Sequence, residues 1–219
     1  MKRLLSLLLA CALCGAAGAQ VAPAFWNDIV AFKKQDSARP APERPILFVG
    51  SSSFTRWADL QQSFPGYPVL NRAFGGSTLK DVIRYSYDVI LPYRPKQVLI
   101  YCGENDLASA DSISAEEVTL RVKTLFGIIR TNLPDAHIAF VSIKPSPSRA
   151  TIQGKVRAAN ASIRKFIRKQ KRAAFIDIYD AMLDGEGKMR ESLYVSDRLH
   201  MTPEGYGIWQ RIIGPYLRQ

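Results

Sequence analysis

Five short runs of apolar residues between residues 46 and 176 constrain the fold of this chain more than any other feature of its sequence. Each run is apolar throughout, and each is followed at once by a glycine or a polar residue. The runs cover residues 46–49, 69–70, 98–102, 138–141 and 174–176. Strands that are buried on both faces of a parallel sheet have this uniform pattern. The sequence therefore predicts a parallel sheet of about five strands.

Amphipathic helical patterns lie between the apolar runs. A capping box begins at Ser114 and opens a helix with one apolar side, and apolar residues recur at helical spacing from Ile152 to Ile167. Pro203 stands at the start of a last helix. Strands that alternate with helices imply right-handed crossovers and a three-layer α/β/α sandwich. In such a fold the ligand site lies at the carboxyl ends of the strands.

The first 19 residues have the pattern of a cleavable signal peptide. Lys2 and Arg3 precede an apolar stretch at 4–13, and small residues at 17–19 precede an expected cleavage site before Gln20. The apolar stretch is too short to span a bilayer comfortably. We therefore expect a periplasmic or secreted protein, with lipoprotein processing at Cys11 as the alternative.

Cleavage would leave a lead-in and linker at 20–45 and a single α/β domain at 46–219. A short amphipathic helix is expected around 25–32, and the prolines of 39–45 predict an extended linker. Cys102 would be the one remaining cysteine, in the buried core, so no internal disulfide is expected. Removing Lys2 and Arg3 lowers the formal charge from +11 to +9. The excess positive charge either lies on a solvated surface or contacts anionic envelope polymers or lipids; no nucleic acid partner is expected.

Polar segments follow the predicted strands and include a carboxylate and an imidazole. Of the two histidines, His137 precedes a predicted strand and falls at the wrong edge of the sheet, so His200 is the expected base. Asp197 precedes His200 by three residues, and on one helical turn that spacing brings its carboxylate to the ring. A plain surface turn is the alternative for this pair taken alone.

Serines fill the turn after the first predicted strand. The segment 50–53 places hydroxyl groups between a buried strand and a helix, where free N–H groups could hold an oxyanion. The alternative is that these serines only cap the helix. The Gly-x-Ser-x-Gly elbow of the ordinary α/β-hydrolases is absent.

Four segments together resemble, in order and spacing, the sequence blocks of the SGNH (GDSL-type) hydrolase superfamily. They are 50–52, 76–78, 103–106 and 197–200, and the resemblance covers about residues 46–213. The chain looks like bacterial GDSL-like lipases and esterases similar to platelet-activating-factor acetylhydrolase catalytic subunits. The resemblance implies a flavodoxin-like SGNH fold and a serine ester hydrolase.

The same resemblance assigns roles to individual residues. It implies a catalytic triad of Ser52, His200 and Asp197, and an oxyanion hole made by Ser52, Gly76 and Asn105. Ser51 replaces the family's aspartate beside the nucleophile. Ser53 is the alternative nucleophile, although it falls one residue too far into the helix.

The expected function is hydrolysis of acyl esters, short-chain or acetyl, on a small molecule or a glycan. The alternatives are a carbohydrate O-acyltransferase and a non-catalytic glycan-binding module on the same fold. Two distant histidines have no metal-ligand spacing, so neither a metal nor another cofactor is expected.

Two basic segments lie outside these blocks. In the loop at 142–149, Lys144 or Arg149 could reach an anionic group of a substrate, unless their charges are simply solvated. The basic face of the helix at 152–172 is solvated or docks weakly on an anionic envelope surface.

Overall fold

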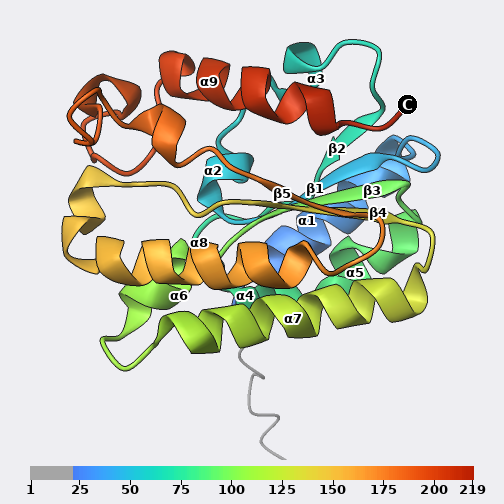
Figure 1. Cartoon of the computed structure of the whole chain (residues 1–219). Coiled ribbons are helices and arrows are strands. Elements are labelled where there is room, and N and C mark those ends of the chain that lie inside the picture. The colour runs from blue at the N-terminus through green and yellow to red at the C-terminus, as the bar shows by residue number, and fades with distance from the viewer. Residues whose placement is uncertain (1–21) are drawn as a thin grey trace, which may run out of the picture.

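The computed structural model describes residues 22–219, so the predicted signal peptide at 1–19 lies outside the described residues. The strands form one sheet in the order β2-β1-β3-β4-β5, and all neighbouring strands are parallel (Figure 1). They are β1 (Ile46–Gly50), β2 (Val69–Asn71), β3 (Gln97–Tyr101), β4 (His137–Val141) and β5 (Ala173–Ile176). The predicted parallel sheet of five strands is confirmed.

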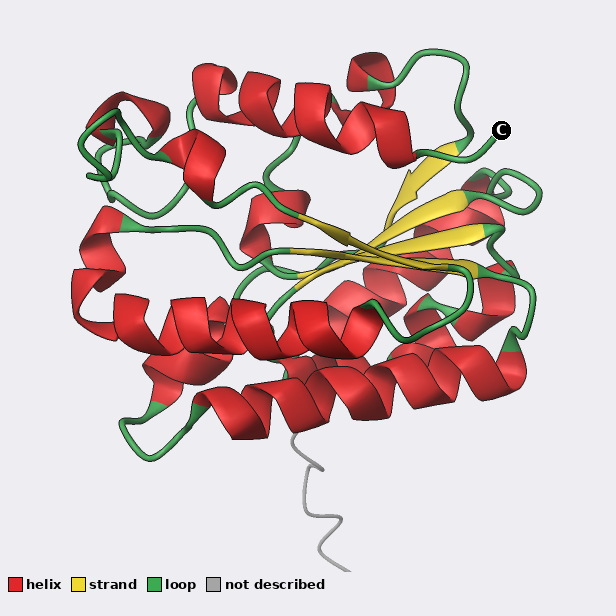
Figure 2. Cartoon of the chain, in the orientation of Figure 1, coloured by secondary structure: helices red, strands yellow, loops and turns green. Residues whose placement is uncertain are grey.

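Helices cover both faces of this sheet and complete the predicted three-layer sandwich (Figure 2). The α-helices are α1 (Trp26–Ala38), α2 (Ser52–Thr55), α3 (Leu60–Ser63), α4 (Leu79–Arg84), α5 (Ser86–Val89), α6 (Glu104–Ser109), α7 (Ala115–Asn132), α8 (Gln153–Ile167) and α9 (Pro203–Ile213). Short 3-10 helices are η1 (Leu91–Tyr93), η2 (Pro147–Ile152), η3 (Asp180–Met182), η4 (Glu191–Leu193) and η5 (Gly214–Tyr216).

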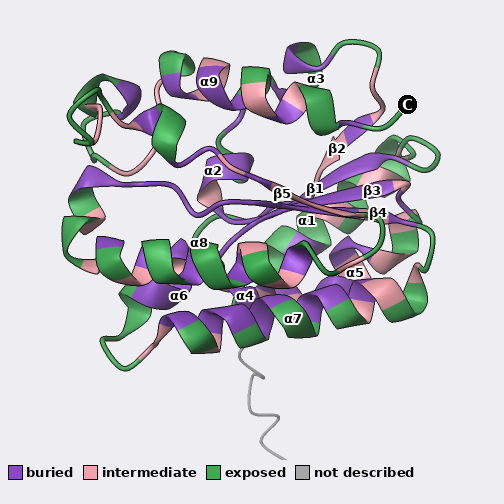
Figure 3. Cartoon of the chain, in the orientation of Figure 1, coloured by how far each residue is buried: buried purple, intermediate pink, exposed green. Residues whose placement is uncertain are grey.

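Two apolar clusters, one on each face of the sheet, hold the layers together. On β1, Leu47 and Val49 enter the cluster shared with α1, α4, α5, α7 and α8, whereas Ile46 and Phe48 enter the cluster shared with α2, α3 and α9. All of β1 is therefore buried, which explains its uniformly apolar sequence. Figure 3 shows buried central strands between helices that are buried on their inner sides, whereas the edge strands β2 and β5 are partly of intermediate burial.

The lead-in forms the expected short helix, α1, and packs against the same layer as α5. Ile29 is fully buried in the first cluster, and Lys33 Nζ lies 2.5 Å from Asp88 Oδ1 of α5. Val30 lies within the predicted amphipathic helix but is 44% exposed, because Ile29 is the one residue of α1 that is buried. Residues 39–45 form neither helix nor strand.

Two glycines let the chain leave the sheet towards the site. At Gly50, φ is 128° and a Cβ atom would lie 1.9 Å from the carbonyl oxygen of Tyr101 in the neighbouring strand. At Gly103, φ is 119° and a Cβ would lie 2.9 Å from Ile143 Cδ1. A side chain at either position would have to displace its neighbour.

Within residues 22–219 no helix is both long enough and apolar enough to cross a membrane.

Candidate active site

Three loops meet at the carboxyl edge of the sheet, as the sequence predicts. From β1 the chain passes through Gly50 into α2, which begins at Ser52; from β3 it passes into α6, whose second residue is Asn105. The loop after β2 joins them, because the Ser77 hydroxyl donates to the Gly50 carbonyl oxygen at 3.0 Å. This edge therefore brings Asn105 into contact with Ser51, which lies 54 positions away in the sequence.

Ser52, His200 and Asp197 form one chain of hydrogen bonds. The His200 Nε2 atom lies 2.9 Å from Ser52 Oγ, and its Nδ1 atom lies 2.6 Å from Asp197 Oδ2. A carboxylate only accepts, so Nδ1 carries the hydrogen and Nε2 is left to accept the proton of the serine hydroxyl. The structure thus places a serine, an imidazole and a carboxylate in the order that nucleophilic catalysis requires.

Asp197 and His200 lie on a non-helical turn, so the predicted helical turn is wrong although the two side chains meet. Asp197 Oδ1 accepts the backbone N–H groups of Leu199 and His200, at 2.9 and 2.8 Å. Arg198 has a left-handed φ of 55°. Such carboxylate–backbone bonds compete with helical ones, and α9 begins only at Pro203.

The environment of Asp197 keeps its carboxylate charged. Partial burial alone would raise the pKa of Asp197, but hydrogen bonds from the His200 ring and from the backbone of His200 and Leu199 hold that pKa well below its ordinary value. Arg56 Nη1 lies 3.7 Å from Asp197 Oδ2 and adds a positive charge. A charged Asp197 would stabilise an imidazolium if His200 took up a proton.

The three N–H donors that the sequence assigns to an oxyanion hole differ in their hydrogen bonds. The backbone N–H groups of Ser52 and Gly76 donate to no acceptor within the described residues. The Asn105 side-chain amide donates to Ser51 Oγ at 2.8 Å and to the Ser77 carbonyl oxygen at 3.0 Å. Both hydrogens of this amide therefore have acceptors at rest, and one of these bonds must be shared or released if an oxyanion binds.

The structure gives Ser51 a definite place. Its side chain is 5% exposed, and its hydroxyl oxygen accepts from Asn105 as a carboxylate oxygen could. Ser53 is 2% exposed and buried in the core, whereas Ser52 is only half-buried and faces His200. Geometry thus favours Ser52 over Ser53 as the reacting hydroxyl.

The loop after β4 makes contacts with α6 that its sequence did not indicate. Lys144 is 1% exposed, and its Nζ lies 2.5 Å from Glu104 Oε2, so the expectation of a substrate-binding or solvated charge is wrong for Lys144. Arg149 donates to Asn105 Oδ1 at 2.9 Å and to the Glu104 carbonyl oxygen at 2.8 Å. The position of this proline-bearing loop after a strand indicated that it lies near the site. Nothing in the sequence identified Asn105 as the hydrogen-bond partner of Arg149.

His137 begins β4 at the opposite edge of the sheet from Ser52. Cys102 is buried as predicted, and burial raises the pKa of its thiol. Among residues 22–219 no cluster of three or more histidine, cysteine or acidic side chains is arranged to hold a metal ion.

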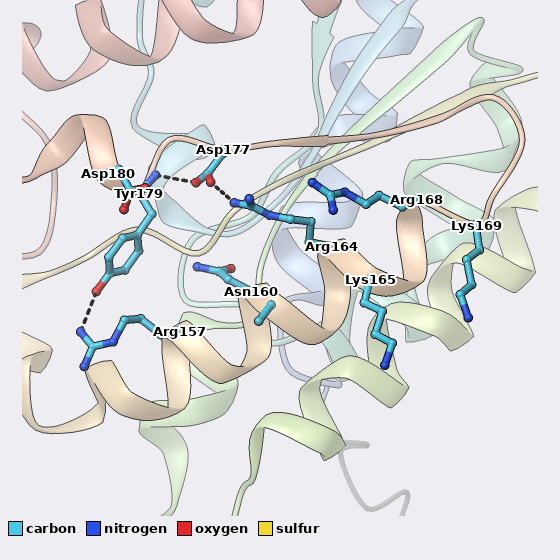
Figure 4. Close-up of a pocket in the computed structure, with 10 residues that line it drawn as sticks. Arg157, Asn160, Arg164, Lys165, Arg168, Lys169, Asp177, Tyr179 and Asp180 are labelled. Atoms are coloured by element: carbon cyan, nitrogen blue, oxygen red, sulfur yellow. Dashed lines mark hydrogen bonds and ion pairs between the residues drawn. The ribbon is translucent and has the colours of Figure 1, made fainter.

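A groove of about 480 Å³ lies apart from Ser52, between α8 and the segment that follows the edge strand β5 (Figure 4). Basic side chains of α8 and of the turn that follows it form one wall, and Asp177 and Tyr179 form part of the other. Arg164 is ion-paired with Asp177, and the amide of Tyr179 donates to Asp177 Oδ1 at 3.1 Å. The residues that line it are Arg157, Asn160, Ala161, Arg164, Lys165, Arg168, Lys169, Asp177, Tyr179 and Asp180.

Comparison with known proteins identifies the family. Residues 41–208 match the model of the GDSL-like lipase/acylhydrolase family. The chain is 25% identical over 175 residues to the platelet-activating factor acetylhydrolase IB subunit alpha2 of Rattus norvegicus, covering 75% of this chain and 72% of the relative. The chain therefore belongs to the GDSL-like lipase/acylhydrolase family of the SGNH superfamily, and it is a carboxylic ester hydrolase.

Solved structures share the fold at lower sequence identity. A GDSL-like lipase from Bacteroides thetaiotaomicron superposes with a TM-score of 0.73 at 21% identity, covering 86% of this chain and 96% of that one. A catalytic mutant of an acetylxylan esterase from Geobacillus stearothermophilus gives a TM-score of 0.64 at 13% identity, covering 80% and 97%. These likenesses confirm the predicted SGNH fold.

Proposed function

We propose that this chain is an exported serine ester hydrolase that uses Ser52 as nucleophile, His200 as base and Asp197 as the group that orients His200. The observation that carries the proposal is the position of His200, whose two ring nitrogens lie within hydrogen-bond reach of Ser52 and Asp197. No single sequence block predicts that contact, since Ser52 and His200 are 148 residues apart.

In the proposed reaction His200 Nε2 removes the Ser52 proton as Oγ attacks an ester carbonyl carbon. The backbone N–H groups of Ser52 and Gly76 and the Asn105 amide stabilise the oxyanion of the tetrahedral intermediate. The imidazolium then gives its proton to the departing alkoxide, which leaves an acyl-serine. Water, activated by the same imidazole, hydrolyses the acyl-serine and restores the enzyme.

We propose that the ester carries a short acyl group. Neither Ser52 nor His200 borders the 480 Å³ groove on α8, nor two further cavities of about 800 and 460 Å³. A similar fold carries an acetylxylan esterase, which favours an acetyl ester on a glycan as one candidate.

For a series of nitrophenyl esters, we expect the acetate or butyrate ester to have a kcat/KM roughly tenfold or more above that of the decanoate ester. The reason for this expectation is the likeness of the fold to that of an acetylxylan esterase, whose name specifies an acetyl group. A steady rise of kcat/KM with chain length would contradict the short-chain preference.

The same assay with an added oligosaccharide acceptor separates hydrolysis from transfer. We expect free acid as the main product, because His200 and Asp197 are 13% and 42% exposed and water reaches them. Acylated oligosaccharide as the main product would favour the O-acyltransferase. Membership of an acylhydrolase family disfavours the glycan-binding module.

Export is proposed from the sequence pattern of residues 1–19 alone.

The groove on α8 adds a proposed contact with an anionic membrane surface. Lys165, Arg168 and Lys169 line it without a carboxylate partner within 4 Å among the described residues. Cations near an anionic bilayer attract it by about 1 kcal/mol each, and salt screens this attraction.

Replacing Lys165, Arg168 and Lys169 together by alanine is therefore expected to weaken binding to phosphatidylserine-containing vesicles on the order of 100-fold. Vesicle co-sedimentation across a salt series measures this effect, with binding of the unaltered chain falling as salt rises. The matched control removes three exposed cations outside the groove: Lys34, Lys80 and Arg211. Salt-independent binding, or equal losses in the two triple variants, would show that the groove is only a solvated surface.

A further inference from the structure

The orientation of the Asn105 side chain decides whether this residue can serve an oxyanion. An asparagine amide has a donating and an accepting end, and only the donating end can stabilise negative charge. Here the NH₂ group faces Ser51 and the Ser77 carbonyl oxygen, in the turn next to Ser52 in the sequence, and the oxygen faces Arg149. Rotation of the amide by half a turn would place its oxygen where the NH₂ group now lies, and that oxygen could not stabilise an oxyanion.

Arg149 selects between these two orientations. Its guanidinium group can only donate, and Nη2 lies 2.9 Å from Asn105 Oδ1. In the reversed orientation the guanidinium would face the amide NH₂ group, and the carbonyl oxygen of Ser77 would face the amide oxygen. Both contacts would then be repulsive, so Arg149 and Ser77 favour the same orientation.

Arg149 is itself held on the segment that carries Asn105. Its Nη1 donates to the carbonyl oxygen of Glu104, the residue before Asn105, at 2.8 Å. Its backbone is fixed by an N–H bond to the Ser146 carbonyl oxygen at 2.9 Å and by Gln153 Nε2, which donates to the Arg149 carbonyl oxygen at 3.2 Å. The Arg149 guanidinium group thus binds the backbone of Glu104 and the side chain of Asn105, two neighbouring residues on α6.

A buried ion pair fixes the distance between the two segments. Lys144 Nζ donates to Glu104 Oε2 at 2.5 Å and to Ser146 Oγ at 2.8 Å. Ser146 Oγ also donates to Glu104 Oε1, so Lys144 and Ser146 both bind the loop after β4 to the Glu104 carboxylate at the start of α6. This arrangement holds the guanidinium in register with Asn105 without help from a substrate.

We propose that Arg149 is a positioning residue, which orients and polarises the Asn105 amide for oxyanion stabilisation and does not contact the substrate. This inference rests on the proposed function, in which Asn105 is an oxyanion donor. It replaces the earlier expectation that Arg149 reaches an anionic group of the substrate.

The test is a double-mutant cycle on kcat for nitrophenyl acetate. Loss of an oxyanion donor typically lowers turnover by roughly 10²–10³-fold, so Asn105→Ala should fall in that range. Arg149→Ala should lower kcat by roughly 10- to 100-fold with KM changed less than about twofold, since only the transition state needs the amide. In the Asn105→Ala background, Arg149→Ala should have no further effect, because the group on which it acts is gone.

Two additional variants control for folding and charge. Arg211→Ala removes an equal charge from an exposed position of α9 and should retain full activity. Arg149→Lys keeps a cation but cannot donate to both Glu104 and Asn105 in the fixed fork geometry, so its kcat should also fall. If the unfolding temperature of Arg149→Ala is lower than that of the unaltered chain, the kcat of Arg149→Lys is used for the test. Millimolar guanidinium chloride, but not sodium chloride, should partly restore kcat in Arg149→Ala.

Unchanged kcat in both Arg149 variants, a change confined to KM, or a further fall in the Asn105→Ala background would each overturn the role of Arg149. Full activity in Asn105→Ala would instead overturn the proposed oxyanion site, and this inference with it.

Discussion

Replacing Ser52 by alanine is expected to lower kcat for nitrophenyl acetate by roughly 10⁴- to 10⁶-fold while the fold is preserved. Ser52 supplies the attacking oxygen, and its Oγ is the atom that His200 Nε2 contacts at 2.9 Å. The methyl group of alanine fits a half-buried position on α2 without new strain. Steady-state kinetics, with circular dichroism to verify folding, measure the effect.

Ser53→Ala is the matched control for this prediction. It removes the same hydroxyl group one residue further along α2, from a side chain that is only 2% exposed. We expect nearly normal kcat in this variant, and loss of activity there with full activity in Ser52→Ala would reassign the nucleophile.

The double variant Ser52→Ala/His200→Ala tests whether the two residues act as a unit. If His200 serves only to activate Ser52, the double variant should be no less active than Ser52→Ala alone, because triad residues are strongly non-additive. A further large fall in the double variant would mean that His200 has a role that does not pass through Ser52.

Replacing Lys144 by methionine is expected to lower the free energy of unfolding by about 3–5 kcal/mol, because the Glu104 carboxylate would remain buried without its counter-ion. Glu104 and Lys144 are both almost inaccessible to solvent, and their charged atoms lie 2.5 Å apart. Urea unfolding at neutral pH, followed by tryptophan fluorescence, measures the change.

The pH dependence of stability should reverse in this variant. Burial alone would raise the pKa of Glu104, but the Lys144 charge and hydrogen bonds from Lys144 and Ser146 lower it below its ordinary value of 4.5. In the unaltered chain, Glu104 therefore stabilises the fold above pH 4.5, and this contribution is lost as pH falls through the lowered pKa. Without Lys144 burial prevails and raises the pKa, so the contribution of Glu104 is lost as pH rises through the raised value.

Two controls separate the buried charge from other effects. Lys80→Met makes the same replacement at an exposed position of α4 and should change stability by less than about 0.5 kcal/mol. Lys144→Met/Glu104→Gln removes both charges and should recover much of the loss. Equal destabilisation in the single and double variants would mean that lost packing, and not an unpaired carboxylate, is the cause.

Local patterns in the sequence were sufficient to predict the strands, the main helices and membership of the SGNH superfamily. The reason is physical: β1 is buried on both faces, so every position of the strand favours an apolar residue or glycine. The strand-end loops could be placed at one edge because parallel strands share a direction. Ser52, Gly76, Asn105, Asp197 and His200 followed from this rule and the resemblance together.

Contacts between loops could not be predicted in the same way. The spacing of Asp197 and His200 suggested a helical turn, but the carboxylate binds the local backbone and gives a different turn with the same side-chain contact. Lys144 and Arg149 were predicted to reach an anionic group of a substrate or to be solvated, because a sequence shows the charge of a side chain but not the partner that neutralises it.

The sequence by itself determined the layers of this protein, the edge that carries its site and the chemical groups available there, because periodicity and burial act over short stretches of chain. Only the tertiary structure decided which hydroxyl faces the imidazole and which way the Asn105 amide points. Those outcomes depend on hydrogen bonds between loops that lie 44 to 148 residues apart, whose directions are fixed only when the whole sheet has assembled.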